Sequence, residues 1–587
     1  MNEYIAALVD EFYQLGVRHA VFSPGSRSTT MAMLFTEHEG FETYMNIDER
    51  SASFMALGIA KVHKEPTVLV CTSGSAVAHY LPAILEAQYS GVPLIVLSAD
   101  RPHTLLHVGA PQTVDQQKIF GTAVNYYEEL AVPQEAHYYT YPRQVARKAY
   151  MKAMDTKKGP VHINVPLFEP LVPELDSKHF EAGRSPFNVV KPNYSSGCNY
   201  DNTSRIRHVN NTSSKHDNFL ARYKNILILA GPQIDVAEAK SILSFATTLQ
   251  APILADPLSN VRRCYNSDSN RSEKECIDTN NVVISTYDAF LAEKELWPIL
   301  KPDCVIQFGQ IVVSKRVQQM VASWDNVEYI EVNPTMDFMN PTGKTTTHMQ
   351  ASIDVFTNLY GVQNDSHAYL GKWQHLETAG KETLGTAIEE PSCFEGRTIR
   401  ELQQHISSNA QVLVANSMTI RDFDYFWFSG ESKAVLYGNR GVNGIDGTIS
   451  TALGLAANGR PTYLVIGDLS LFHDLNGLAV AKTHNLNLTI ILHNNDGGGI
   501  FEYLPQKGTK HFDYLFSTSQ GLDYSGAAKL YGCGYTKIFS PDELSSVLAN
   551  VSQESGVHII EIPTNREYSR ELHKKYTKVS VDMEALL

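Results

Sequence analysis

Short apolar runs of strand length recur along the chain, and nearly all of them end in small or polar residues. They are AVFSPG, TVLVCTSG, LIVLSAD, ILILAGP, APILADP, CVIQFGQ, EYIEVNP, QVLVANS, AVLYGN, YLVIGDLS and TIILHNND. Stretches with helical spacing, such as SAVAHYLPAILEAQYSG and GTISTALGLAANG, lie between them. This alternation predicts parallel sheets with helices on both faces. Ligands of such sheets bind beyond the carboxyl ends of the strands, where these polar residues would lie.

The chain has 587 residues, which is too long for one hydrophobic core. A Ser- and Asn-rich segment over residues 192–218 and a seam near residues 363–392 divide the strands into three groups. We therefore expect an α/β protein with three doubly wound parallel-sheet domains. The expected limits are 1–185 for the first domain, 186–218 for a polar linker or insertion, 219–362 for the middle domain, 363–392 for a second linker and 393–587 for the third domain. A further polar loop, at residues 264–281, interrupts the middle domain.

Composition and charge argue against several functional classes. The formal net charge is −14 and no basic stripe is present, so no nucleic-acid partner is expected. The start, MNEYIAALVDEF, has the pattern of an amphipathic helix rather than a signal peptide, and no run reaches the roughly 18 apolar residues of a membrane span. Seven cysteines stand singly without CxxC spacing, which favours reduced thiols and a cytoplasmic location and disfavours a zinc site.

Two polar residues stand at the ends of consecutive predicted strands in the last third of the chain. Asp468 follows YLVIG, and Asn495 follows TIILHN 27 residues later. A carboxylate, an amide oxygen and backbone carbonyls at adjacent strand ends form the oxygen-only site that Mg²⁺ prefers. The glycines after Asn495 would let the backbone approach a diphosphate closely. Two ordinary strand-end turns are the alternative reading.

Three consecutive charged residues, Asp48, Glu49 and Arg50, stand just before the apolar helical run SFMALGIAK. An acidic first turn that complements the helix dipole would contribute on the order of a few tenths of a kcal/mol. A proton-handling acid set among apolar neighbours is the other interpretation. This segment alone does not decide between them.

The G-D…N-N pair at this spacing resembles the signature of the thiamine diphosphate enzymes, whose three domains are pyrimidine-binding, middle and diphosphate-binding. Glu49 stands where that family has its cofactor-activating glutamate, which shares a proton with the aminopyrimidine. The resemblance implies thiamine diphosphate and Mg²⁺ as cofactors, with Mn²⁺ as an alternative cation. It implies that the metal is bound by Asp468, Asn495 and the backbone carbonyl of Gly497. The cofactor-binding residues that it implies are Glu49, Gly467, Asp468, Leu469, Ser470, Asn495 and Ile500.

Eight motifs together resemble the branch of this family that serves menaquinone biosynthesis: SPGSRSTT, DERSASFMALGIAK, TSGSAVAHYLPAILEA, LSADRP, GAPQTVDQ, GNRGVNGIDG, GDLSLFHDLNGL and NNDGGGIFEYLP. That branch implies decarboxylation of 2-oxoglutarate and Stetter-like conjugate addition of the succinyl unit to isochorismate. Each of these substrates carries two carboxylates, so the site needs several cations in spite of the negative net charge. Arginine pairs well with planar carboxylates, and four arginines lie in predicted strand-end loops: Arg27, Arg101, Arg421 and Arg440.

The resemblance also assigns roles to individual residues. Those implied to hold isochorismate are Ser26, Arg27, Arg101, Gln112 and Lys315. Those implied to face 2-oxoglutarate are Ser417 and Arg421 at its distal carboxylate and Arg440 at its reacting end. The residues expected to act in catalysis are Glu49, Gln112 and Arg440. An apolar wall is implied for three residues that would fit a buried core equally well: Ile500, Phe501 and Leu504.

The resemblance implies a homodimer or a dimer of dimers, because Glu49 of one subunit would serve cofactor bound mainly by the other. The chain departs from the expected pattern at Pro111 and Asp496. A related enzyme that acts on another oxo acid remains an alternative, as does a non-catalytic relative. Intact Glu49, Asp468 and Asn495 argue against the second. No G-x-G-x-x-G or G-x-S-x-G motif supports a dinucleotide oxidoreductase or a serine hydrolase.

Overall fold

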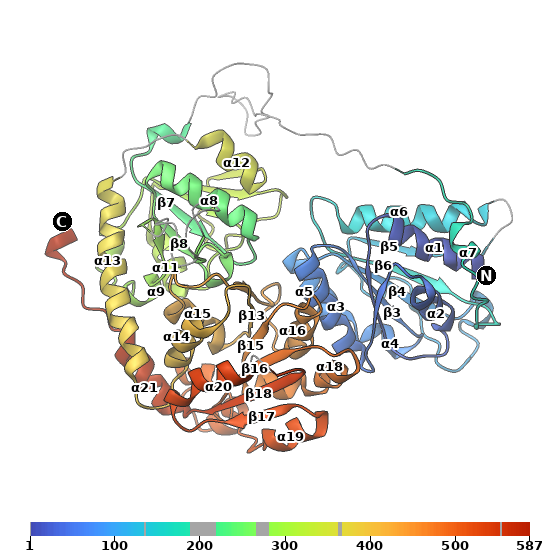
Figure 1. The fold of residues 1–587 in the computed structure, drawn as a ribbon. Coiled ribbons are helices and arrows are strands. Elements are labelled where there is room, and N and C mark those ends of the chain that lie inside the picture. The colour runs from blue at the N-terminus through green and yellow to red at the C-terminus, as the bar shows by residue number, and fades with distance from the viewer. Residues whose placement is uncertain are drawn as a thin grey trace.

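The computed structural model describes residues 2–133, 137–187, 219–265, 281–361, 367–551 and 554–586. Within these ranges the chain forms three six-stranded sheets whose paired strands all run parallel. In Figure 1 the first domain is blue and cyan, the middle domain green and yellow, and the third domain orange and red. The prediction of an α/β protein with three parallel-sheet domains is confirmed.

The first sheet has the strand order β2-β1-β3-β4-β6-β5. Its strands are β1 (His19–Phe22), β2 (Glu42–Met45), β3 (Thr67–Cys71), β4 (Leu94–Asp100), β5 (Tyr126–Glu129) and β6 (Pro160–Pro166). Its helices are α1 (Asn2–Gln14), α2 (Thr29–Glu37), α3 (Glu49–His63), α4 (Ser75–Ala78), α5 (Leu81–Ser90), α6 (Thr140–Ala153) and α7 (Lys178–Glu181). Every residue of β3, β4 and β6 is buried, as expected for central strands covered on both faces.

The third sheet has the order β14-β13-β15-β16-β18-β17, which is the order of the first sheet when strands are counted along the chain. Its strands are β13 (Gln411–Val414), β14 (Val435–Tyr437), β15 (Thr462–Gly467), β16 (Leu488–Asn494), β17 (Gly534–Lys537) and β18 (Val557–Pro563). Its helices are α14 (Glu395–His405), α15 (Met418–Phe426), α16 (Thr448–Ala456), α17 (Asp468–His473), α18 (Ala479–Thr483), α19 (Tyr524–Tyr531), α20 (Leu544–Val551) and α21 (Arg566–Tyr576).

The middle sheet has a different connectivity, β12-β11-β10-β7-β8-β9, with its first strand at the centre. Its strands are β7 (Ile226–Ala230), β8 (Ile253–Ala255), β9 (Val283–Ile284), β10 (Cys304–Phe308), β11 (Glu328–Asn333) and β12 (Thr347–Gln350). Its helices are α8 (Val236–Leu249), α9 (Tyr287–Phe290), α10 (Leu296–Ile299), α11 (Lys315–Ser323) and α12 (Ile353–Tyr360). The third domain also contains the short helices η7 (Leu475–Leu478) and η8 (Gly499–Tyr503).

The first and third domains are joined through helices α3 and α16, which lie side by side in Figure 1. Two glycines allow the close approach. A Cβ atom on Gly58 would collide with the carbonyl oxygen of Thr451, and one on Gly454 would collide with that of Met55. The buried apolar side chains of the two domains consequently form one continuous cluster.

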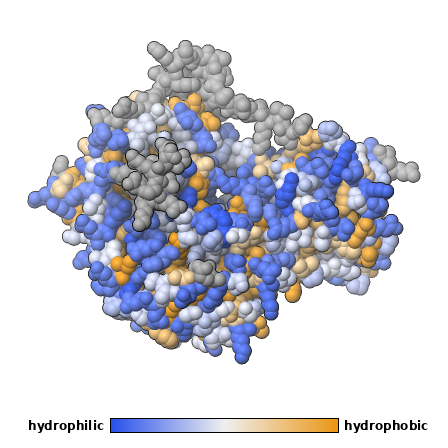
Figure 2. Space-filling view, viewed as in Figure 1, coloured by the Kyte–Doolittle hydropathy of each residue, from blue (hydrophilic) through white to orange (hydrophobic). Residues whose placement is uncertain are grey.

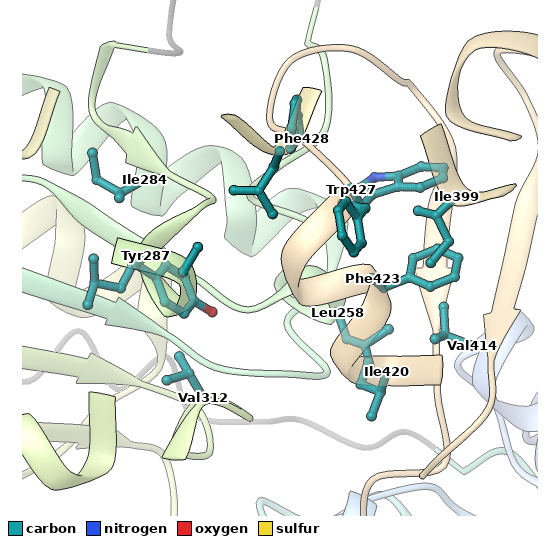
Figure 3. Packing of buried hydrophobic residues seen from close by; sticks show 14 of the residues in the cluster. Leu258, Ile284, Tyr287, Val312, Ile399, Val414, Ile420, Phe423, Trp427 and Phe428 are labelled. Carbon is teal, nitrogen blue, oxygen red and sulfur yellow. The ribbon is translucent and has the colours of Figure 1, made fainter. Parts of the chain in front are cut away.

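The middle and third domains share a second apolar cluster. Figure 3 shows Tyr287 and Val312 of the middle domain across from Phe423 and Trp427 of the third. A fully buried arginine, Arg262, also crosses this boundary and donates to Oδ1 of Asp424 at 2.6 Å. Figure 2 shows a mixed surface on the visible face, where hydrophobic residues are interspersed among hydrophilic ones.

Three expectations from the sequence need comment. The segment expected as the second linker is largely a helix, α13 (His367–Gly385), because Tyr369, Trp373 and Leu376 recur at helical spacing and are buried. The polar segments at 192–218 and 266–280 lie outside the described residues. Cys264 is disulfide-bonded, so the expectation of reduced thiols is wrong there, whereas free thiols are present at Cys71, Cys304, Cys393 and Cys533. Across the described residues, no helix combines the length and the apolar character needed to cross a membrane.

Candidate functional site

Asp468 and Asn495 lie at neighbouring strand ends in the third sheet. Strands β15 and β16 pair in register up to Gly467 and His493, so the segments that follow the two strands begin at the same edge of the sheet. Asp468 is buried, and its Oδ2 accepts a hydrogen bond from the backbone N–H of Gly497 at 2.7 Å. Oδ1 of Asn495 is buried and has no hydrogen-bond partner among the described residues. An unsatisfied buried amide oxygen beside a buried carboxylate suits a bound cation.

Burial raises the pKa of Asp468 to about 6, and the charge of Asp496 acts in the same direction. A cation at this corner would favour the ionised form of Asp468. The carboxylate of Asp496 points elsewhere, because its Oδ1 accepts hydrogen bonds from the backbone N–H groups of Gln520 at 3.0 Å and Gly521 at 2.9 Å. This departure from the expected family pattern therefore organises a neighbouring loop.

The glycines after Asp496 are required by the packing of the backbone. Gly497 has φ +141°, a conformation that side chains disfavour, and a Cβ atom there would collide with the carbonyl oxygen of Ser517. A Cβ atom on Gly498 would lie 2.5 Å from the carbonyl oxygen of Phe516. Together with Asp468 and Asn495, this close-packed turn has the donor set and the bare backbone that a metal diphosphate requires.

The charged residues at the start of α3 have separate partners. Asp48 caps the helix by accepting from the backbone N–H of Ser51 at 3.1 Å, and it also accepts from Nδ2 of Asn476 at 2.7 Å. Arg50 donates to the carbonyl oxygen of His473 at 2.9 Å. Glu49 is half-buried and forms no hydrogen bond or ion pair with any residue that the structure describes. The cap at Asp48 and the interdomain contact of Arg50 thus leave the carboxylate of Glu49 without a hydrogen-bond partner among the described residues.

Glu49 also lies near a buried polar pair beneath the helix start. Burial raises the pKa values of Cys71 and Tyr80, and the charge of Glu49 adds to both shifts. Within one chain, Arg50 and Ser51 contact His473 and Asp474 at the C-terminal end of α17. Helix α17 begins at Asp468 and rises by about 7.5 Å along its axis to its last residue, so these contacts lie at the end of α17 away from Asp468.

Two of the predicted isochorismate residues in the first domain contact Ser73. The guanidinium of Arg101 donates to Oγ of Ser73, and Nε2 of Gln112 donates to the carbonyl oxygen of Ser73 at 2.9 Å. Burial and the nearby guanidinium of Arg27 lower the pKa of Arg101. Sequence reasoning did not single out Ser73, although it lies within the quoted motif TSGS directly after a strand.

Arg27 has unused hydrogen-bonding capacity. It donates to the carbonyl oxygen of Leu167 at 3.2 Å and lies 3.6 Å from the exposed carboxylate of Glu169. Its Nε is buried without a hydrogen-bond partner among the described residues. Ser26 is exposed at the same loop. Two neighbouring guanidiniums, one of them with a donor unpaired among the described residues, suit an anion.

The third domain brings Arg421 and Arg440 together. Arg421 donates to the carbonyl oxygen of Ser417, whose own φ is +67°. Arg440 donates to Oδ1 of Asn416 at 2.7 Å. Burial lowers the pKa of Arg440, and the charge of Arg421 acts in the same direction, whereas Asp256 opposes it. A second cationic pair therefore lies beyond β13 and β14.

Lys315 is exposed in the first turn of α11. The preceding loop is fixed by Asp256, whose Oδ2 accepts from the backbone N–H of Val313 at 2.9 Å. The predicted apolar wall is half-buried rather than part of the core, and it lies on or just after η8: Ile500, Phe501 and Leu504. Residues around Asp468 are also partly accessible at Gly467 and Leu469, whereas Ser470 is buried.

Comparisons with known proteins cover nearly the whole chain. Three family models match: the thiamine pyrophosphate enzyme N-terminal binding domain at residues 3–119, the middle domain at 199–414 and the C-terminal binding domain at 417–562. A 2-succinyl-5-enolpyruvyl-6-hydroxy-3-cyclohexene-1-carboxylate synthase of Lactococcus lactis subsp. lactis is 49% identical, over 98% of this chain and 99% of its own. A synthase of the same name from Desulfitobacterium hafniense is 44% identical, over 99% and 100%.

A solved structure shares the fold at much lower identity. Benzoylformate decarboxylase from Polynucleobacter necessarius superposes with a TM-score of 0.68 at 16% identity. The match covers 96% of this chain and 98% of the other. At this identity the likeness establishes the three-domain architecture alone.

Proposed function

This chain belongs to the 2-succinyl-5-enolpyruvyl-6-hydroxy-3-cyclohexene-1-carboxylate synthase family of thiamine pyrophosphate enzymes, and from that premise we propose that it catalyses the reaction in the family name. In that reaction 2-oxoglutarate loses its C1 carboxylate as CO₂. The remaining succinyl unit forms a carbon–carbon bond with isochorismate, and one proton is taken up. The product enters menaquinone biosynthesis.

The observation that carries the proposal is the presence of two arginine pairs at strand ends in a chain of net charge −14. Arg27 and Arg101 lie in the first domain, and Arg421 and Arg440 lie in the third. Each substrate brings two carboxylates, so two cationic pairs match two dianions. An enzyme for a substrate with fewer carboxylates would have no comparable need for both pairs.

The residues present fit thiamine diphosphate with Mg²⁺, and Mn²⁺ has the same preference for oxygen ligands. Asp468 and Asn495 would hold the metal through their side chains and Gly497 through its carbonyl oxygen. Gly467, Leu469, Ser470 and Ile500 would line the rest of the cofactor site. When bound, the cofactor stabilises the negative charge left by decarboxylation.

The chain's own residues supply proton handling and orientation. Glu49, which has no competing hydrogen-bond or ion-pair partner among the described residues, holds and moves a proton at the aminopyrimidine ring. Ser26, Arg27, Arg101 and Lys315 hold isochorismate, while Gln112, anchored by Ser73, is oriented toward its reacting end.

The oxo acid is oriented by the third domain. Arg440 faces the carboxylate that is lost, and Ser417 with Arg421 holds the distal one. Phe501 and Leu504, both half-buried, exclude water from the apolar side of the site.

The active unit in this proposal is a homodimer or a dimer of dimers. Its support is that the side chain of Glu49 forms no hydrogen bond or ion pair with any described residue of its own chain, while the nearby Ile47 is 75% exposed. Exposed apolar surface beside a glutamate that would serve the partner's cofactor suits a subunit interface. A cytoplasmic location is also proposed from the four free cysteines among the described residues, and the disulfide at Cys264 weighs against it.

The test is an absorbance assay of isochorismate loss with 2-oxoglutarate, thiamine diphosphate and Mg²⁺ on the wild type and on Glu49→Gln. Turnover should need all four components and fall by about 100-fold or more in the variant. Glu65→Gln, an exposed acid just beyond the same helix, should leave it unchanged. Full turnover in Glu49→Gln would remove Glu49 from its role. A wild type that binds cofactor but spares isochorismate would point to another oxo-acid substrate pair.

Subunit sharing of the site has its own test. Glu49→Gln and Asp468→Asn, each inactive alone, are unfolded together, refolded and assayed. If Glu49 serves the partner's cofactor, one of the two sites in each mixed dimer holds both native residues. Random mixing makes about half of the dimers mixed, so about a quarter of the wild-type rate should return. No recovery from dimers shown to have mixed would place both residues in one chain's site.

A further inference from the structure

The first domain contains a buried ion pair that the proposed reaction does not use. Nζ of Lys61, near the end of α3, lies 3.7 Å from Oε1 of Glu86, on α5. Their side chains are 7% and 1% exposed. Burial lowers the pKa of Lys61, and the carboxylate of Glu86 opposes this shift. Such a pair is favourable only if further hydrogen bonds satisfy both partners.

Those hydrogen bonds go to the third domain, on both sides of Arg440. Lys61 donates to the carbonyl oxygen of Gly438 at 2.7 Å. Oε1 of Glu86 accepts from the backbone N–H of Gly441 at 2.9 Å, and Oε2 accepts from that of Val442 at 2.8 Å. The loop over residues 438–442 is thus attached to the first domain at three points.

The loop is also pressed closely against α5. A Cβ atom on Gly441 would lie 2.5 Å from the carbonyl oxygen of Glu86 and 3.0 Å from the backbone nitrogen of Ser90. Only glycine permits this approach, because any side chain would push the loop away from the helix.

The third domain holds the same loop from the other side. Nδ2 of Asn416 donates to the carbonyl oxygens of Asn439 at 2.8 Å and Gly444 at 2.6 Å, while its Oδ1 accepts from Arg440. The charge of Glu86 also reaches the guanidinium of Arg440, where it favours the protonated form. The backbone on both sides of Arg440 is therefore held by the first domain, and its guanidinium is held by Asn416 of the third.

We propose that Lys61 and Glu86 are positioning residues for Arg440, so that the first domain sets how well this arginine of the third domain binds the reacting end of 2-oxoglutarate. The inference rests on the proposed function, in which Arg440 faces that carboxylate. It predicts a defect confined to one of the two substrates, because isochorismate is held by a separate cationic pair.

The contact between α13 and the middle domain offers a matched control. Glu377, on α13, is also a buried acid, and its Oε2 accepts from two consecutive backbone N–H groups of the middle domain, of Ser285 at 3.0 Å and Thr286 at 2.9 Å. It too lies near a lysine, with Oε1 3.4 Å from Nζ of Lys381. Glu377→Gln therefore removes the same kind of interaction without touching the Arg440 loop.

The experiment compares Glu86→Gln, Glu86→Asp and Glu377→Gln with the wild type, as full-length enzymes loaded with cofactor and Mg²⁺. In Glu86→Gln an amide N–H₂ faces a backbone N–H donor, so the KM for 2-oxoglutarate should rise about tenfold while that for isochorismate stays within about twofold. Glu86→Asp keeps the charge and should recover part of the loss. Glu377→Gln should leave the ratio of the two KM values unchanged.

A second readout needs no substrate. Hydrogen exchange in the peptide over residues 436–447 should speed up in Glu86→Gln and not in Glu377→Gln. If Glu86→Gln fails to fold, Gly441→Ala keeps both charges, displaces the loop and should give the same selective change in KM.

The outcomes separate the two proposals. A folded Glu86→Gln enzyme with an unchanged KM for 2-oxoglutarate would overturn the positioning role, as would an equal rise in both KM values. A wild type that consumes neither substrate would overturn the proposed function and, with it, the assignment to 2-oxoglutarate. Faster exchange in Glu86→Gln would then still demonstrate the hold on the loop.

Discussion

The first and third sheets have the same strand order and each carries an arginine pair at its carboxyl ends, yet the other loop residues there differ in their chemistry. The third sheet places Asp468, Asn495 and a glycine turn at β15 and β16, which suits a metal diphosphate. The first sheet places Ser73, Arg101 and other polar groups there, which suits an organic anion. The middle sheet has another order and contributes Lys315 alone to the predicted site. Connectivity therefore does not determine function, and a few loop residues on similar sheets do.

The largest effect is expected from the metal corner, where two neighbouring acids can be compared. Asp468→Asn should lower activity by about 100-fold or more, because a neutral amide is a weaker ligand for Mg²⁺. Titration calorimetry with thiamine diphosphate and Mg²⁺ should show weaker binding. Asp496→Asn is the control, since that carboxylate holds the backbone at Gln520 and Gly521. Equal losses in both variants would contradict the assignment of Asp468.

The next effect concerns Ser73 in the first domain. Ser73→Ala removes the hydroxyl that anchors Arg101, so the KM for isochorismate should rise by about tenfold while that for 2-oxoglutarate stays constant. Steady-state kinetics with each substrate varied in turn measures this. Ser75→Ala, an exposed serine two residues away, is the matched control. A rise in the KM for 2-oxoglutarate instead would show that the two sheets do not divide the substrates.

The joint between the two sheets can be tested through its glycines. Gly454→Ala places a methyl group against the carbonyl oxygen of Met55, and such overpacking should destabilise the protein by about 1–3 kcal/mol. Differential scanning calorimetry should show a lower unfolding temperature. Gly371→Ala in α13 meets nothing within 4 Å and should be neutral or stabilising by up to about 1 kcal/mol. If both variants unfold like the wild type, the close helix contact is absent in solution.

The smallest effect is a difference in pH response between the two domains. In the first domain, burial alone would raise the pKa of Asp10, in α1. Hydrogen bonds from His38, Arg184 and Arg143 nevertheless hold that pKa below 3.8. Its stabilisation is present above that value and is lost as the pH falls through the lower, folded-state pKa. Asp10 therefore matters most to the stability of the first domain at neutral pH.

His573, in α21, responds in the opposite direction. Burial alone would lower its pKa, but the carboxylate of Asp422, 2.7 Å away, raises it above 6.5, and Glu395 adds to the shift. Its stabilisation is present below 6.5 and is lost as the pH rises through the folded-state pKa. The other titratable groups facing this pair are Arg421, His493 and Tyr503.

Thermal unfolding from pH 3 to 9 compares the two variants. The penalty of Asp10→Asn should shrink on acidification, and that of His573→Gln should shrink on alkalinisation. Parallel curves for the two variants would contradict the difference between the domains.

The sequence was sufficient for the sheets because their strands are continuous apolar runs, such as β3 and β16, bounded by polar turns. The corner of Asp468 and Asn495 could be predicted as well, since parallel neighbours end at one edge. The roles given to the site residues and the exact domain limits stay predictions. The sequence does not predict helix α13, because its polar face obscures the spacing of Tyr369 and Trp373.

Other features have no local signature at all. Glu86 accepts hydrogen bonds from backbone N–H groups 355 and 356 residues further along the chain. Backbone N–H groups do not depend on the type of side chain, so the sequence gives no signal of these contacts. The strand order of the middle sheet depends in the same way on distant partners. Composition and periodicity carry information about the local conformation of a residue and not about its contacts with distant parts of the chain.

The two shared apolar clusters have a consequence for synthesis on the ribosome. One cluster joins the first domain to the third, and the other joins the middle domain to the third. The third domain is translated last, so apolar faces of the two earlier domains, such as Phe54 on one and Tyr287 on the other, stay uncovered until the chain is nearly complete. Nascent chains that stall early would expose both faces and recruit chaperones.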